Sequence, residues 1–136
     1  MFQEDWVMRQ VESIVNFLTM AVLNKKTPAF ELSETFETST ADELHANLLK
    51  LIQENRINEA ENLLFDKLDS NDQRYLEVAV DFYSKLNLLD DDTLHRCEFS
   101  REEIADGLKE VAGRFGIPLS ELFQSLPQEE DECDMA

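Results

Sequence analysis

The stretch NRINEAENLLFDKLD, residues 55–69, has the pattern of a turn followed by an amphipathic helix. Its apolar side chains recur at helical spacing and share one face; they are Ile57, Ala60, Leu64 and Leu68. A matching stripe precedes the turn, at Leu44, Leu48, Leu51 and Ile52. Helices joined by so short a turn pack as antiparallel neighbours. The stretch therefore predicts the second half of a helical hairpin.

Apolar stripes of the same kind recur along the chain and predict an all-α fold. Capping boxes of the form Ser/Thr-x-x-Glu/Gln mark helix starts at Thr40, Ser70 and Ser100. Gly116 is expected to end the last long helix. Gly and Pro number only three each, which favours a mostly helical chain. The segment before Ser100, residues 87–99, is expected to be a connector.

The length of 136 residues predicts one domain. We expect this domain to span residues 1–126. Residues 127–136 should form a disordered acidic tail, because they contain little that a core would bury. The expected order within the domain is a first helix at 3–24, a linker at 25–40, two antiparallel helical hairpins at 41–115 and a short helix at 118–126.

The charge of the chain is strongly negative, with 30 acidic against 12 basic residues and a net charge of −18. Such a chain repels nucleic acids and anionic membranes, so neither is expected as a partner. Solubility is the simplest consequence of this charge. The sharper alternative is an acidic mimic that occupies a basic partner.

The apolar run IVNFLTMAVL, residues 14–23, has about the length of a signal-peptide core. The segment before it carries more acids than bases, whereas a signal peptide begins with positive charge. The run is also too short to span a bilayer. Two cysteines, Cys97 and Cys133, do not make a disulfide framework. A cytoplasmic location is therefore expected.

Residues suited to catalysis or metal binding are sparse. His45, His95 and Cys97 are the candidate metal ligands, but a zinc site needs about four ligands, usually in two close pairs. The acidic run at 90–92 lacks the Gly and the spaced oxygen ligands of an EF-hand loop. We expect no catalytic residue, no metal and no cofactor. The alternative is a metal-dependent enzyme or regulator that uses these three residues and nearby acids.

Apolar positions also match at a spacing of 34 residues, which is the period of tetratricopeptide repeats. The matched pairs are Leu44 with Val78, Leu48 with Phe82, Leu49 with Tyr83, and Ile52 with Leu86. The turn and small residue of N-x-I-x-E-A, residues 55–60, resemble that family as well. The chain departs from it at Leu48, where a small residue is usual, and at Asp72, where Pro is usual. These residues predict a tetratricopeptide-like pair of hairpins.

A second resemblance covers nearly the whole chain and rests on the segments DWVMRQVE, INEAENLLFDKLD, DFYSKLN and FSREEIADGL. They resemble a family of small uncharacterised bacterial proteins, known only as a domain of unknown function and sometimes noted as tetratricopeptide-like. The resemblance implies a bacterial cytosolic protein with a helical fold. It implies no catalytic residue.

The favoured function is a non-enzymatic helical module that binds a protein or peptide, or itself. By the partial repeat match, six residues face a groove between the hairpins: His45, Leu49, Ile52, Ala79, Tyr83 and Leu86. The first helix is apolar on nearly all sides, so its surplus face needs a cover, either the linker or a second copy in a homodimer. Trp6 and Phe17 are the candidate contacts on that helix.

Overall fold

The computed structural model of the chain describes residues 2–23, 40–117 and 119. All regular structure among these residues is helical, which confirms the all-α prediction. The elements are α1 (Phe2–Phe17), the π-helical turn η1 (Leu18–Val22), α2 (Thr40–Gln53), α3 (Ile57–Lys67), α4 (Gln73–Asn87), α5 (Asp91–Arg96) and α6 (Arg101–Arg114). The predicted linker, short last helix and acidic tail lie outside the described residues, except for residues 40 and 119.

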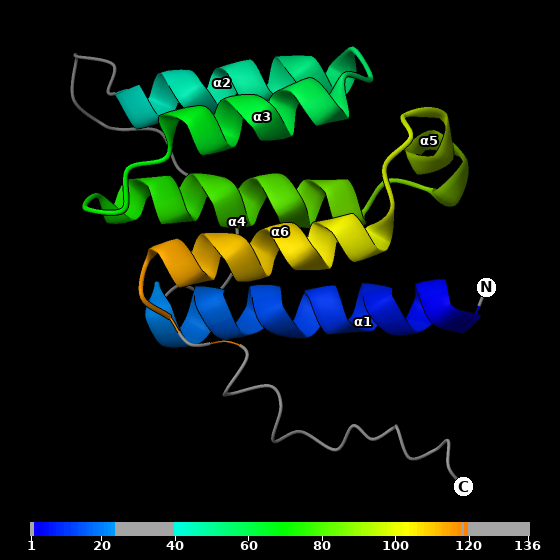
Figure 1. Ribbon diagram of the computed structural model, residues 1–136, viewed down its shortest axis with the longest axis horizontal. Coiled ribbons are helices and arrows are strands. Elements are labelled where there is room, and N and C mark those ends of the chain that lie inside the picture. The colour runs from blue at the N-terminus through cyan, green and yellow to red at the C-terminus, as the bar shows by residue number, and fades with distance from the viewer. Residues whose placement is uncertain (1, 24–39, 118, 120–136) are drawn as a thin grey trace, which may run out of the picture.

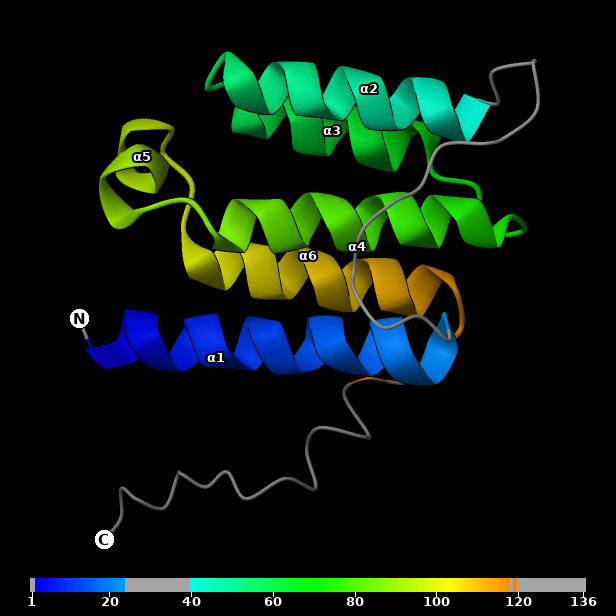
Figure 2. The ribbon, with the colours of Figure 1, turned by 180° about the vertical axis from the view of Figure 1, so that it is seen from behind.

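The centre of the fold is α4, which packs against α1, α2 and α6 (Figures 1 and 2). The α2–α3 hairpin forms one end of the molecule, and α1 lies along α4 and α6 at the other end. A central helix must be apolar on more than one side. The side chains that α4 buries accordingly surround it; they include Tyr75, Leu76, Val78, Ala79, Val80, Phe82, Tyr83 and Leu86.

Polar contacts dock the α2–α3 hairpin on α4. Arg74 donates a hydrogen bond of 2.7 Å to buried Asp42. His45 Nε2 donates to Asp81 Oδ2 at 2.6 Å, and Lys85 donates to the other oxygen of Asp81 at 2.7 Å. Burial raises the pKa of the Asp81 carboxyl, but the hydrogen bonds from His45 and Lys85 outweigh burial, so that its net pKa is lowered. Asp81 is therefore an ionised group inside the α2–α4 interface.

Two local expectations were wrong. The capping box at Ser70 does not start α4, because Asp72 is the N-cap and accepts from the backbone N–H of Arg74. The connector at 87–99 contains α5, whose N-cap Asp90 accepts from the backbone N–H of Thr93. The cap at Ser100 is confirmed, since its hydroxyl accepts from the backbone N–H of Glu103.

The first helix also differs from the prediction near its end. Regular α-helix stops at Phe17, and the chain continues as one π-helical turn in which Leu23 N–H donates to Leu18 C=O at 2.9 Å. The carbonyl of Val22 accepts from the side chain of Gln73 at the start of α4. Among the described residues, no helix combines the length and apolar character needed to cross a membrane.

Candidate functional site: the acidic groove between α3 and α6

A groove of about 290 Å³ lies between α3 and α6, the two helices drawn in green and in yellow to orange in Figure 1. We call it the α3–α6 groove. Its lining residues are Glu61, Asn62 and Phe65 from α3, and Glu103, Asp106, Gly107 and Glu110 from α6. Four of these seven residues are acids, so the groove is an acidic cleft with one aromatic ring.

Helical spacing explains how the acids come to face the groove. Glu103, Asp106 and Glu110 are three and four residues apart on α6, which aligns them along one side of the helix. The opposite side of α6 is buried through Ile104, Leu108, Val111 and Ala112. On α3, Glu61 and Phe65 are four residues apart and lie on one side in the same way.

Tyr83 of α4 supports the groove from below. Its side chain is fully buried, and its hydroxyl donates a hydrogen bond of 2.6 Å to Glu61 Oε2. The phenol reaches Glu61 by passing Gly107, where a Cβ atom would lie 2.3 Å from Tyr83 Oη. The glycine in the middle of α6 therefore leaves the space that the phenol occupies.

The electrostatics of the groove centre on Glu61. Burial raises the pKa of its carboxyl, the hydrogen bond from Tyr83 lowers it, and repulsion by Glu103 and Glu110 raises it further, with a net increase. The pKa of Tyr83 is raised far above its usual range, by burial first and then by the charge of Glu61, so the phenol remains a neutral donor. An ionised Glu61 is thus held among like charges.

One cation of the chain, Arg114, stands beside the groove. Its guanidinium lies over the Phe65 ring, 4.8 Å from the centroid, and donates to Glu110 Oε2 at 3.1 Å. A guanidinium in this position combines a cation–π contact with an ion pair. Within the chain, the aromatic ring and one carboxylate of the groove, that of Glu110, thus contact an arginine side chain.

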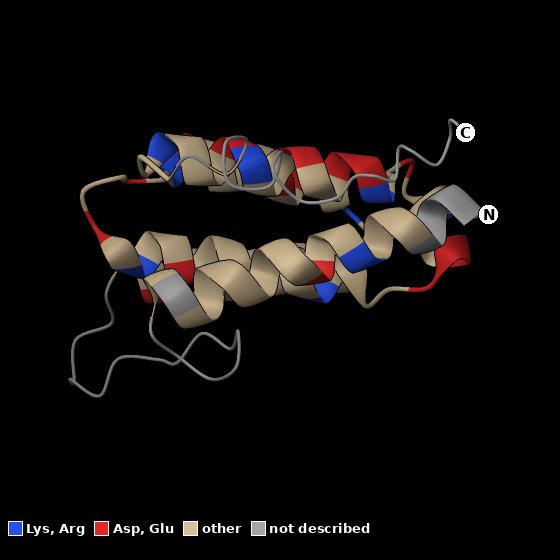
Figure 3. Cartoon of the chain, turned by 90° about the horizontal axis from the view of Figure 1, so that it is seen from below, with Lys and Arg blue, Asp and Glu red and all other residues tan. Residues whose placement is uncertain are grey.

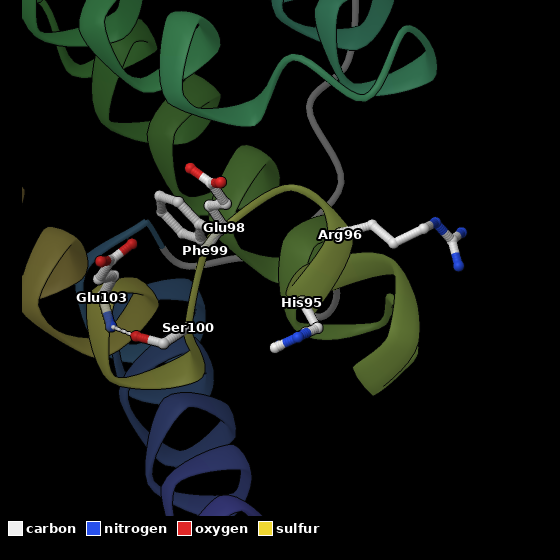
Figure 4. A pocket seen from close by; sticks show the side chains of 6 residues that line it. All are labelled: His95, Arg96, Glu98, Phe99, Ser100 and Glu103. Carbon is white, nitrogen blue, oxygen red and sulfur yellow. Dashed lines mark hydrogen bonds between the residues drawn. The ribbon is translucent and has the colours of Figure 1, made fainter.

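A second cavity, of about 410 Å³, adjoins the first at Glu103. It is lined by residues of the α5–α6 turn and its flanks: His95, Arg96, Glu98, Phe99, Ser100 and Glu103. Figure 4 shows the hydrogen bond between Ser100 and Glu103 at the start of α6, and the Arg96 side chain extending away from the others. The second cavity therefore has a mixed lining, with Glu98 and Glu103 beside Arg96 and His95.

The structure places the eight predicted partner-binding residues in different environments. Ala79, Tyr83 and Leu86 are fully buried in α4, and His45 is buried in its bond with Asp81. Leu49 and Ile52 are half-buried on α2, and Phe17 is half-buried on α1. Trp6 is 50% exposed. Of the eight, Tyr83 approaches the α3–α6 groove, from below it.

The candidate metal ligands lie on two elements, with His45 on α2, and His95 and Cys97 together at the end of α5. Within residues 2–23, 40–117 and 119, no three His, Cys, Asp or Glu side chains are arranged to hold a metal ion. The carbonyl of Cys97 instead accepts from the side chain of Asn58 and ties the turn to α3.

The sequence contains a pattern that indicates the groove, but the large number of acidic residues in the chain makes this pattern hard to recognise. Acids are so frequent in this chain that no single pair of acids is informative, and a solvated helix face is the ordinary interpretation of such a pair. The pattern is the combination of acids at positions 103, 106 and 110 with Gly107 on the same helix, and of Glu61 with Phe65 one turn later. What the sequence does not show is that these two faces lie next to each other.

Comparison with known proteins identifies a family. The model of a family described as "Family of unknown function (DUF6483)" matches residues 1–116, in agreement with the resemblance to a domain of unknown function. Neither the curated proteins nor the solved structures contain a match to the chain.

Proposed function

The chain belongs to this family of unknown function, and we propose that it is a non-enzymatic helical module that binds a basic segment of a protein partner in the α3–α6 groove. The observation that carries the proposal is that four acids and Phe65 line one groove. A cytoplasmic location and a tetratricopeptide-like use of paired hairpins are parts of the same proposal.

The chemistry of the groove favours arginine or lysine side chains. Carboxylates at Glu61, Glu103 and Asp106 offer ion pairs, and the partly buried position of Glu61 reduces the screening that weakens ion pairs at an open surface. Arg114 already occupies the end of the groove at Phe65 and Glu110. A partner cation at the Glu61 end would relieve the repulsion that Glu103 and Glu110 exert on Glu61.

The arrangement of helices supports a docking role for this side of the molecule. The buried face of α3 packs on α2, and that of α6 packs on α1 and α4. The groove-lining residues Asn62, Glu103, Asp106 and Glu110 on their other sides are exposed. Grooves between adjacent helical hairpins are common binding surfaces in helical repeat proteins. Net charge of −18 adds long-range attraction for a basic partner and speeds its encounter.

Binding of a short synthetic peptide rich in arginine and alanine tests the proposal. Fluorescence anisotropy would compare the wild type with the groove variant Glu61→Gln/Asp106→Asn. The matched control is Asp66→Asn/Glu102→Gln, which removes the same two charges from the same two helices at exposed positions outside the groove lining. We expect the groove variant to weaken binding about tenfold or more, equivalent to about 1.4 kcal/mol, and the control to weaken it much less. Equal losses would show attraction by net charge alone and contradict the proposal.

A further inference from the structure

Arg114, the last residue of α6, connects that helix to α3 through its guanidinium group. The guanidinium lies 4.8 Å from the centroid of the Phe65 ring on α3, and it donates a hydrogen bond of 3.1 Å to Glu110 Oε2 on α6. A guanidinium stacks on aromatic faces and pairs with carboxylates, so these two groups suit it. Phe65 and Glu110 both line the α3–α6 groove, and the same end of the groove therefore already holds an arginine side chain.

This contact is exposed, so the arginine side chain can leave it. The side chain of Arg114 is 45% exposed and that of Glu110 is 56% exposed. Ion pairs and cation–π contacts at exposed positions are individually weak. An arginine side chain also moves between staggered rotamers, so that leaving the ring requires no change in the helix backbone.

We propose that Phe65 and Glu110 form a guanidinium subsite, which Arg114 occupies in the unbound chain and an arginine of the partner occupies in the complex. The inference rests on the proposed function, since the partner is the basic segment that binds in the groove. The ring face that holds Arg114 cannot stack a second guanidinium at the same time, so Arg114 competes with the partner. Lysine lacks the planar group that stacks, and a lysine-rich segment gains less from this subsite.

Arg114→Gln empties the subsite and replaces the arginine with another good helix former. The variant should bind the arginine–alanine peptide about fivefold or more tightly than the wild type, because the fraction of molecules with an empty subsite sets the apparent affinity. A peptide with lysine in place of each arginine should show a smaller gain. Fluorescence anisotropy measures both peptides on both proteins.

Removing any arginine makes the chain more negative, so the comparison needs a control of equal net charge. Acidic and basic segments are interspersed along the helices, as Figure 3 shows. The matched control is Arg56→Gln. Arg56 is an exposed arginine that precedes α3, and it pairs with Glu54 and Glu59, which do not line the groove. We expect this control to tighten the binding of both peptides slightly and to the same extent.

Displacement of Arg114 has a direct readout in ¹⁵N-labelled protein titrated with the unlabelled arginine–alanine peptide. The Nε–H signal of Arg114 is the one that is missing from the spectrum of Arg114→Gln. The Phe65 ring shields this group while the two are stacked. Peptide binding should therefore move the signal toward the position typical of exposed arginines. A signal that stays in place while the peptide binds would show that Arg114 keeps the subsite, which contradicts the inference.

The binding data can also overturn the subsite. Equal gains for Arg114→Gln and Arg56→Gln would show an effect of net charge, and equal gains for the two peptides would show no preference for guanidinium. Weaker binding by Arg114→Gln would place Arg114 in the binding surface itself. In each of these cases the proposed function stands if Glu61→Gln/Asp106→Asn still weakens binding relative to its own control. Loss of that difference would remove the proposed function and the subsite with it.

Discussion

Gly107 lies in α6 directly against the Tyr83 phenol, and its missing side chain has a measurable consequence. A Cβ at this position would lie 2.3 Å from Oη and 2.5 Å from Cζ of Tyr83. Alanine normally stabilises a helix relative to glycine by about 1 kcal/mol. We expect Gly107→Ala to destabilise the fold instead, by about 1–3 kcal/mol, because the phenol has to move. Denaturant unfolding of the purified variant measures the change.

Gly113 on the same helix is the control. Nothing lies within 4 Å of a Cβ built there, and the residue is exposed. Gly113→Ala should therefore show the ordinary helix preference and stabilise the fold by about 1 kcal/mol. If both alanine variants stabilise the fold, the close packing of Tyr83 under α6 is wrong.

Glu61 should make the folded protein less stable at neutral pH than at acidic pH. Its pKa is raised in the folded state, so folding favours the neutral carboxyl, and that contribution is lost as pH rises through the folded pKa. Glu61→Gln keeps an oxygen that accepts from Tyr83 and removes the charge. We expect the free energy of unfolding of the variant to exceed that of the wild type at pH 8 by less than about 1 kcal/mol. Near pH 4 the two proteins should be equally stable.

Urea unfolding at the two pH values checks this difference. A wild type that gains stability over Glu61→Gln as pH rises would contradict the stated sign. A stabilising substitution that also weakens peptide binding would mean that the ionised carboxyl is maintained for binding at the expense of stability.

Sequence patterns identified which residues are apolar, but not which of them a partner can reach. Ala79, Tyr83 and Leu86 were assigned to a groove because the repeat spacing aligns them with α2. They are buried because α4 is covered on several sides, by α1 and α6 as well as by α2. The number of neighbours around a helix is a tertiary property that periodicity does not contain.

Helices with long apolar stripes were predictable to within a few residues at their ends. The expected hairpin turn at 55–56 separates α2 from α3, and the stop at Gly116 coincides with a positive φ of 77° that glycine adopts readily. The sequence does not predict the six-residue α5, because a helix of fewer than two turns has too few positions to show a period. Its start was nevertheless encoded by Asp90, an N-cap within the acidic run.

Two of the predicted capping boxes begin with a serine, but one of these serines caps a helix and the other does not. Ser100 accepts from the backbone N–H of Glu103 at 3.1 Å, whereas Asp72 caps the helix that follows Ser70. We expect Ser100→Ala to lower the free energy of unfolding by about 1 kcal/mol. Ser70→Ala, two residues before the actual cap, should change it little. Thermal or urea unfolding of both variants measures these changes. Equal losses of stability in the two variants would show that Ser70 also caps a helix.

The groove forms only when helices that are far apart in the sequence pack together in the folded molecule. Three of its four acids come from α6 and one from α3, and these helices are separated in the chain by α4 and α5. The sequence predicts each face as a solvated helix surface, and it predicts the helices themselves. Their adjacency follows from α4, which holds the α2–α3 hairpin through its bonds with Asp42 and His45 and supports α6 on another side.

Backbone amide chemical shifts recorded during titration with the arginine-rich peptide test the central claim most directly. The account predicts that the largest shift changes lie at the groove-lining residues of α3 and α6, between positions 61 and 65 and between 103 and 110, with little change along α2 and α1. Nearby changes at the α5–α6 turn would fit, because its cavity adjoins the groove at Glu103. Changes spread evenly over all acidic surfaces, or concentrated on another helix, would contradict the assignment of the α3–α6 groove as the binding site.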